Sequence, residues 1–106
     1  MRVLLDACVP KGLRWSLPGH EVQTAHEAGW GDLDNGDLLD AMQGLFDVLV
    51  TVDKRLPSQQ HIKARPLGIA VLRARSNRLA DLLPLVPALL AALSMLKPGT
   101  VEEITG

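Results

Sequence analysis

Short, uninterrupted apolar runs recur along the chain and predict strands that are buried on both faces. The clearest runs cover residues 2–6, 47–52 and 67–72. Continuous apolar stretches of about four to eight residues are typical of parallel strands covered on both sides by helices. Weaker patterns over residues 20–25 and 100–104 predict two further short strands.

Helical patterns fall between these strands. A helix is predicted over residues 10–16, because a proline suits the first helical turn. Residues 36–45 place four apolar side chains on one face of a second helix. A third, strongly apolar helix is expected over residues 77–96, with kinks near Pro84 and Pro87. Strands that alternate with helices predict a parallel sheet covered on both faces.

Length and composition narrow the class of protein. At 106 residues and 47% apolar, the chain is expected to form one domain over residues 1–106. The single cysteine, Cys8, excludes an intramolecular disulfide and favours a reducing cytoplasm. A strand pattern at the start argues against a signal peptide. The most apolar stretch, residues 82–96, is shorter than the ~20 residues of a membrane span and contains two prolines.

Charge is distributed unevenly although the net charge is only −1. Residues 1–53 carry nine acids and three basic residues, a balance of −6, whereas residues 54–80 carry seven basic residues and no acid. An acidic half followed by a basic block predicts a place where a metal and a polyanion meet. A basic block can equally be a solvated surface, and both interpretations stay open at this point.

Two of the apolar runs end in a single aspartate, Asp6 and Asp53. The carboxyl ends of parallel strands share one edge of a sheet, where ligands bind. Two carboxylates at that edge predict a site for a hard divalent cation, since like charges repel unless a cation lies between them. The alternative is that each aspartate caps the element that follows its strand.

The second helix begins with further polar candidates. Asp37 lies in the first turn, where the helix dipole favours an anion whatever the function. Asp34 or Asn35 is expected to cap the helix, and Asn35 also suits a neutral metal ligand.

Other reactive residues form no recognisable motif. The three histidines and Cys8 lack the spacing of a zinc site, and Cys8 has no evident partner base. His61, in the basic block, is a weak candidate for a phosphate contact. The chain has neither a glycine-rich phosphate loop nor a G-x-S-x-G nucleophile motif.

Four segments in order resemble the short PIN-like proteins of bacteria, relatives of the PIN-domain ribonuclease toxins. They are the opening Leu-Leu-Asp with a proline four residues later, residues 35–39 (Asn-Gly-Asp-Leu-Leu), residues 48–54 (Val-Leu-Val-Thr-x-Asp-Lys) and residues 71–78 (Val-Leu-Arg-x-Arg-Ser-Asn-Arg). The resemblance implies an α/β domain of three layers, α/β/α, with a mostly parallel central sheet of about five strands. It also implies an acidic Mg²⁺ or Mn²⁺ site that cleaves RNA.

By position, the resemblance assigns catalytic and metal-binding roles to three acids: Asp6, Asp37 and Asp53. Five polar or basic residues would contact the RNA: Lys54, Arg73, Arg75, Asn77 and Arg78. The expected function is a metal-dependent endoribonuclease, the toxin of a toxin–antitoxin pair. The chain departs from the family at Ala7 and Cys8, where short PIN-like proteins often have an acid or an amide, and a fourth acid has no clear counterpart.

Two alternatives remain. One is a catalytically degenerate PIN-like module that binds RNA or a partner protein without cleaving it. The other is a response-regulator receiver domain, suggested by Asp53, by Pro57 and by Lys97 followed by proline. The receiver lacks support after the first strand, where receivers carry two acids and this chain has Asp6 followed by alanine.

The apolar helix over residues 77–96 predicts an interface. Its leucines occupy more than one face, so we expect one face on the sheet and an apolar strip outside. That strip would serve a homodimer or an antitoxin segment. The alternative is that neighbouring helices cover it.

Overall fold

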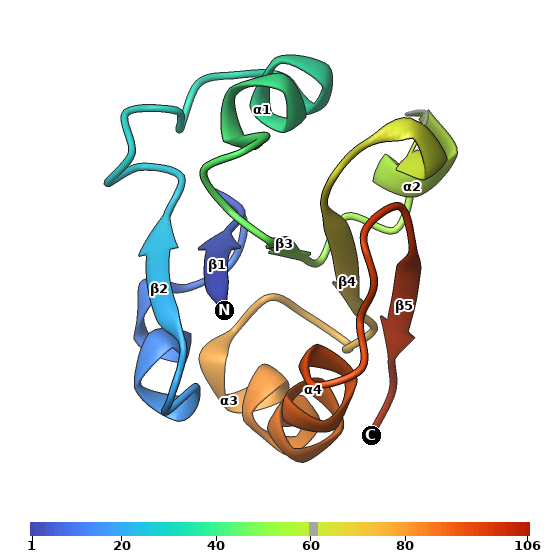
Figure 1. Cartoon of the computed structure of the whole chain (residues 1–106). Helices are drawn as coiled ribbons and strands as arrows, with labels where there is room; N and C mark the ends of the chain where they lie inside the picture. Colours follow the sequence, from blue (N-terminus) through green and yellow to red (C-terminus); the bar gives the residue numbers. More distant parts are fainter. Residues whose placement is uncertain (60–61) are drawn as a thin grey trace.

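A computed structural model describes residues 1–59 and 62–106, and within them one five-stranded sheet of parallel strands in the order β2-β1-β3-β4-β5 (Figure 1). The elements are β1 (Arg2–Leu5), η1 (Lys11–Ser16), β2 (Glu21–Thr24), α1 (Asn35–Met42), β3 (Val48–Thr51), α2 (Leu56–Gln59), η2 (Ile62–Ala64), β4 (Gly68–Leu72), α3 (Leu79–Leu82), η3 (Leu83–Leu85), α4 (Val86–Leu93) and β5 (Val101–Ile104). His61 lies outside the described residues.

The sheet confirms the predicted α/β class and its three layers. Helices α3 and α4 lie against one side of the sheet and α1 against the other (Figure 1). The 3₁₀ helix η1 joins the α3–α4 side. Strands β1, β3 and β4 are therefore covered on both faces, which is why their sequences are continuous apolar runs.

Side chains alternate between the two layers along each central strand. In β1, Val3 and Leu5 belong to the core beneath α3 and α4, whereas Leu4 belongs to the core beneath α1. In β3, Val50 and Leu49 divide in the same way. This period of two determines the side of the sheet that any later residue reaches at the end of a strand.

The connections place a crevice between β1 and β3. From β1 the chain passes through η1 to β2 on one face, and from β2 it passes through α1 to β3 on the other. In open α/β sheets, the carboxyl edge at such a change of direction is where ligands bind. The residues that follow β1 and β3 therefore lie where sheets of this kind bind ligands.

The long apolar helix is replaced by three shorter elements, α3, η3 and α4. Breaks fall at Leu83–Leu85 and Val86, next to Pro84 and Pro87, where the prolines remove hydrogen bonds within a helix. In the described residues, no helix has the length and apolar character that a membrane crossing requires.

The outward apolar strip is smaller than expected. Four leucines that the sequence allows on either face are buried in the core: Leu82, Leu85, Leu89 and Leu93. Leu90 is half-buried and packs against that core, while Leu83 is 43% exposed and Met95 is exposed.

Candidate functional site

Asp6 and Asp53 follow two neighbouring parallel strands at the same edge of the sheet. β1 pairs with β3 through Val3–Val48, Leu4–Leu49 and Leu5–Val50. The Asp6 backbone N–H donates to the Val50 carbonyl at 2.9 Å, so the pairing extends to the aspartate itself. The predicted meeting of Asp6 and Asp53 on one rim is therefore confirmed by the topology.

Thr51 links the two aspartates. Its hydroxyl donates to Asp6 Oδ2 at 2.7 Å and accepts the Asp53 backbone N–H at 3.1 Å. Thr51 is fully buried and Asp6 is only 8% exposed. The Ala7 backbone N–H adds a 2.8 Å hydrogen bond to Asp6 Oδ1. These neutral donors hold the Asp6 carboxylate in one orientation without neutralising its charge.

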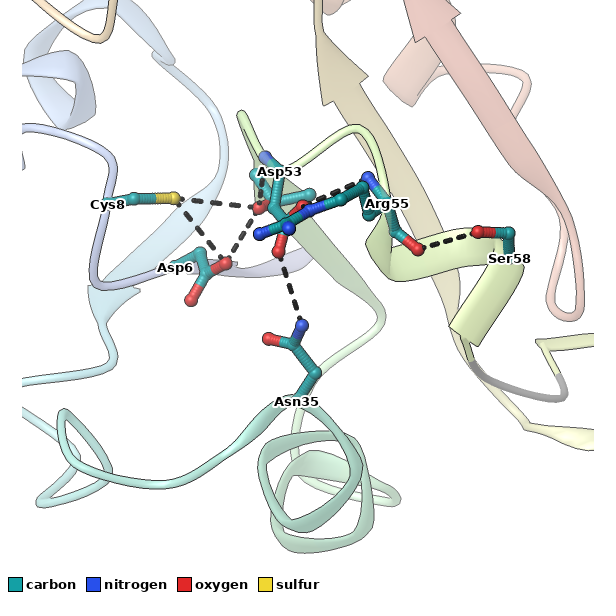
Figure 2. A network of polar contacts seen from close by, with 7 residues as sticks. Asp6, Cys8, Asn35, Asp53, Arg55 and Ser58 are labelled. Carbon is teal, nitrogen blue, oxygen red and sulfur yellow. Dashed lines mark hydrogen bonds and ion pairs between the residues drawn. The ribbon is translucent and has the colours of Figure 1, made fainter.

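Asp53 is more accessible and has different partners. Its Oδ1 accepts the Arg55 backbone N–H at 2.9 Å, with the Arg55 guanidinium 3.7 Å away, and Asn35 Nδ2 donates to Oδ2 at 3.3 Å (Figure 2). Partial burial works against the charged form, but the bonds from Arg55 and Asn35 outweigh it and hold the pKa of Asp53 below its usual value. The carboxylate is therefore ionised at neutral pH.

Cys8 lies against the same cluster as an uncharged thiol. Its Sγ is 3.6 Å from Asp6 Oδ2 and 3.7 Å from Thr51 Oγ1 (Figure 2). Burial, together with the nearby Asp6 carboxylate, raises the pKa of the Cys8 thiol, while hydrogen bonds to Val52 and Thr51 oppose that rise in part. A raised pKa disfavours the thiolate, so Cys8 is unsuited to act as a nucleophile or a thiolate ligand.

The structure does not bring Asp37 to the two strand-end aspartates. Asp37 is exposed, and its backbone N–H bonds to the Asp34 carboxylate that caps α1. Helical geometry explains this: at about 100° per residue, Asp37 lies about 200° around α1 from Asn35. Asn35 shares the face of buried Leu38, so the helix directs the amide, not Asp37, toward the sheet edge.

The donor set at this edge suits a hard cation in part. Across residues 1–59 and 62–106, no three histidine, cysteine or acidic side chains gather as a metal-binding group. Mg²⁺ is commonly held by one or two carboxylates, with waters and substrate phosphates completing its coordination. Asp6 and Asp53 supply two carboxylates, and the Asn35 amide lies beside Asp53. The residues therefore fit one cation shared with a substrate better than a closed protein cage.

The basic block divides between the two edges of the sheet. Arg65 lies toward the opposite edge, where it pairs with Asp40 and Gln43 near the end of α1. Arg73 follows β4 and pairs with Glu103 at 2.9 Å. Three basic residues are exposed at the carboxyl edge, with no ion pair recorded among the described residues: Lys54, Arg75 and Arg78. Of the five residues predicted to contact RNA, Arg73 is therefore ion-paired, three are exposed cations, and Asn77 is the fifth.

Asn77 has a structural contact at the site. Its Nδ2 donates to the Cys8 carbonyl at 3.0 Å and so connects the β4–α3 loop to the loop after β1. Asn77 is exposed beside Arg78 on the wall of a pocket that adjoins Cys8. This hydrogen bond brings the β4–α3 loop close to Asp6, although the two are far apart in sequence.

The receiver alternative meets an obstacle at Lys97. The observed strand order also occurs in receiver domains, so topology alone does not separate the two interpretations. Lys97 precedes β5, and its carbonyl lies beside Gly68 at the start of β4. It therefore lies at the edge opposite Asp53, away from the candidate site.

Two contributors were missed in the sequence, Thr51 and Arg55. Thr51 lies two residues before Asp53 and therefore on the same side of the sheet, a signal that the strand period carries. Arg55 lies next to Asp53 because the chain turns tightly there, and its backbone N–H donates to the carboxylate of Asp53 two residues earlier. For Asn35 the sequence left two roles open, a metal ligand or the helix cap. The cap is Asp34, and the Asn35 amide lies beside Asp53.

In the comparisons with known proteins, no protein-family model, curated protein or solved structure matches the chain.

Proposed function

We propose that the protein is a PIN-like metal-dependent endoribonuclease that acts as the toxin of a toxin–antitoxin pair. The observation that carries the proposal is the meeting of Asp6 and Asp53 at one sheet edge, beside exposed Lys54, Arg75 and Arg78. Two carboxylates next to cations that form no ion pair with the described residues suit a divalent cation and a phosphate backbone together.

Each side chain has a distinct task in this proposal. Asp6, held by Thr51, and Asp53 would hold Mg²⁺ or Mn²⁺, which when bound lowers the pKa of a water and polarises the scissile phosphate. The exposed cations Arg75 and Arg78 would bind the phosphates that flank the cut. Arg55 would release Asp53 and turn to the phosphate as RNA enters.

The test is cleavage of a labelled single-stranded RNA by the full chain with Mn²⁺. We expect Asp53→Asn to lower the rate by at least about 100-fold, since it removes a ligand charge while keeping the shape. Asp37→Asn is the matched control and is expected to keep wild-type activity, because Asp37 faces away on α1. Equal activity of the wild type and Asp53→Asn, or equal losses in both variants, would contradict the proposal.

A catalytically degenerate RNA-binding module is the second candidate. The observation that favours it is the coverage of Asp53 by Arg55 and Asn35, with no third acid grouped nearby in the part of the chain described. Wild-type protein that binds RNA but leaves it uncut with Mg²⁺ and with Mn²⁺ would establish this module instead. Its binding would still require Arg75 and Arg78.

The toxin role also calls for a partner. We propose that an antitoxin segment or a second copy of the chain covers the apolar surface that includes Leu83. Leu83→Glu is expected to convert a dimer to a monomer in light scattering with little change in melting temperature. Leu90→Glu should instead lower the melting temperature, because Leu90 packs against the core. A monomeric wild type would exclude the homodimer.

A further inference from the structure

The loop from Ala7 to Pro10 forms a ridge at the carboxyl edge, with a pocket on each side. The pocket toward α3 has a volume of about 430 Å³ and is lined by Asn77 and Arg78 of the β4–α3 loop. The pocket toward β2 has a volume of about 530 Å³. Both are lined by Ala7, the residue directly after Asp6, so both adjoin the candidate site.

The pocket toward β2 combines three kinds of polar side chain. Lys11 supplies a cation, His26 a planar ring and Glu27 an anion. The apolar residues of the ridge line the same pocket. None of the three belongs to the acidic pair or to the basic block. Together they offer a phosphate contact, a stacking surface and a hydrogen-bond acceptor, which are the three elements that recognise a nucleotide in a single strand.

Glu27 is a fixed acceptor in this pocket. Its Oε1 accepts the Thr24 backbone N–H at 2.9 Å and a hydrogen bond from Arg14 Nη2. In return, the Glu27 backbone N–H donates to Thr24 Oγ1 at 3.1 Å. The bonds from Thr24 and Arg14 lower the pKa of Glu27, so the group is an acceptor at neutral pH. With Oε1 engaged, Oε2 is the oxygen available to a ligand.

His26 is held as firmly on the other side. Its ring packs over Gly31 so closely that a side-chain carbon at Gly31 would overlap the ring. A glycine therefore makes room for the ring beside the pocket. The exposed His26 ring is therefore supported on one side by Gly31.

We propose that the pocket of Lys11, His26 and Glu27 is a nucleobase subsite that selects a base carrying an exocyclic amino group. This inference rests on the proposed RNA-binding function and adds a second subsite across the ridge from Arg78. A carboxylate only accepts hydrogen bonds, so it pairs with the exocyclic amino group of cytosine, adenine or guanine. Uracil presents a carbonyl oxygen where cytosine has its amino group, and that oxygen is repelled by the carboxylate.

The experiment measures binding without cleavage. Fluorescence anisotropy of labelled hexacytidylate and hexauridylate is recorded with the full wild-type chain in EDTA at constant ionic strength. We expect cytidylate to bind about 5-fold to 10-fold more tightly than uridylate, which corresponds to one ordinary hydrogen bond at an exposed carboxylate. Glu27→Gln should reduce that ratio to about 2-fold or less, because the amide offers a donor as well as an acceptor.

Matched variants separate base selection from general effects. Glu21→Gln, an exposed glutamate at the other end of β2, should leave the ratio unchanged. Lys11→Ala should weaken both oligonucleotides equally and reduce the slope of log affinity against log salt by about 0.7, the value for one single-stranded phosphate contact. Should Glu27→Gln fail to fold by circular dichroism, His26→Ala takes its place and should weaken both oligonucleotides by loss of stacking.

Each outcome points to one conclusion. Equal binding of the two oligonucleotides by the wild type, weakened by Arg78→Ala but not by Lys11→Ala or His26→Ala, overturns the subsite and leaves the proposed function intact. A lack of binding to either oligonucleotide overturns the RNA-binding function together with the subsite. A wild-type preference that Glu27→Gln leaves unchanged assigns the selection to another part of the edge and also overturns the subsite.

Discussion

Asp47 and Asp6, at the two edges of the sheet, are held in different ways. At the amino edge, both Asp47 oxygens accept hydrogen bonds from Arg2, at 2.7 Å from its backbone N–H and 3.2 Å from its guanidinium. At the carboxyl edge, Asp6 is held by a hydroxyl and a backbone N–H, which orient the carboxylate but carry no positive charge. Asp47 is therefore paired with an arginine, whereas Asp6 forms no ion pair within the part of the chain that the structure describes.

The basic residues also differ between the two edges of the sheet. Arg65, toward the amino edge, has 15% of its side chain exposed and bonds to Asp40 and Gln43. Arg75 and Arg78, beyond β4, are exposed. Arg73 also follows β4 but pairs with Glu103, so the carboxyl edge contains both paired and exposed cations.

Exchanging aspartate for asparagine at each edge should give opposite results, and this is the largest effect expected. Asp6→Asn should lower RNA cleavage by at least about 100-fold, because it removes the charge of a proposed metal ligand. Asp47→Asn should keep full cleavage and lower the free energy of unfolding by about 1 kcal/mol or less, because its pair with Arg2 is partly exposed. Cleavage assays and urea denaturation measure the two effects, and the same pattern at both edges would break the comparison.

Thr51→Val tests whether the carboxyl edge depends on its neutral donor. Valine keeps the shape but removes the hydroxyl, so the buried Asp6 oxygen loses a 2.7 Å hydrogen bond. We expect a loss of about 1–3 kcal/mol in the free energy of unfolding and weaker binding of Mn²⁺. The exposed Thr105→Val is the control, and equal stability of the two variants would show that the Thr51 bond contributes nothing.

Titration with acid extends the comparison, because Asp47 and Asp53 both have lowered pKa values. The Arg2 backbone N–H bond, only partly opposed by burial, holds the pKa of Asp47 below its usual value of 3.8. A carboxyl group with a lower pKa in the folded state stabilises the protein above its unfolded pKa, and this contribution is lost as the pH falls through the folded value. Asp47→Asn should therefore lose less stability than the wild type as the pH falls below the usual pKa of 3.8 in urea titrations. An unchanged acid dependence would contradict the pairing at Arg2.

Arg55→Ala is expected to have the smallest effect on folding. The guanidinium is 82% exposed and 3.7 Å from Asp53, so its loss should change the free energy of unfolding by less than about 0.5 kcal/mol. Calorimetric titration with Mn²⁺ should show affinity raised by about 2-fold to 5-fold, because a competing cation is removed. A fall in Mn²⁺ affinity would show that Arg55 supports the site instead of covering it.

Some of the candidate site was accessible from local patterns. The aspartates after two continuous apolar runs meet at one edge, as predicted, because burial on both faces forces such runs into neighbouring central strands. The orientation of Asn35 was also encoded: the spacing that groups Leu38 and Met42 on one face of α1 includes Asn35 and excludes Asp37. The resemblance to PIN-like proteins assigned a role to Asp37, whereas the helical periodicity places Asn35 on the side of α1 that faces Asp53.

What the sequence determines by itself is the set of elements and the face that each apolar residue presents, since both depend on neighbours within a few positions. The tertiary structure alone decided which polar groups meet. The hydrogen bond from Thr51 to Asp6 spans 45 residues and exists only in the β1–β3 register. The division of the basic block likewise depends on where each connection crosses the sheet. Local periodicity carries no information about such long-range pairings, because they follow from the order of strands and not from the residues between them.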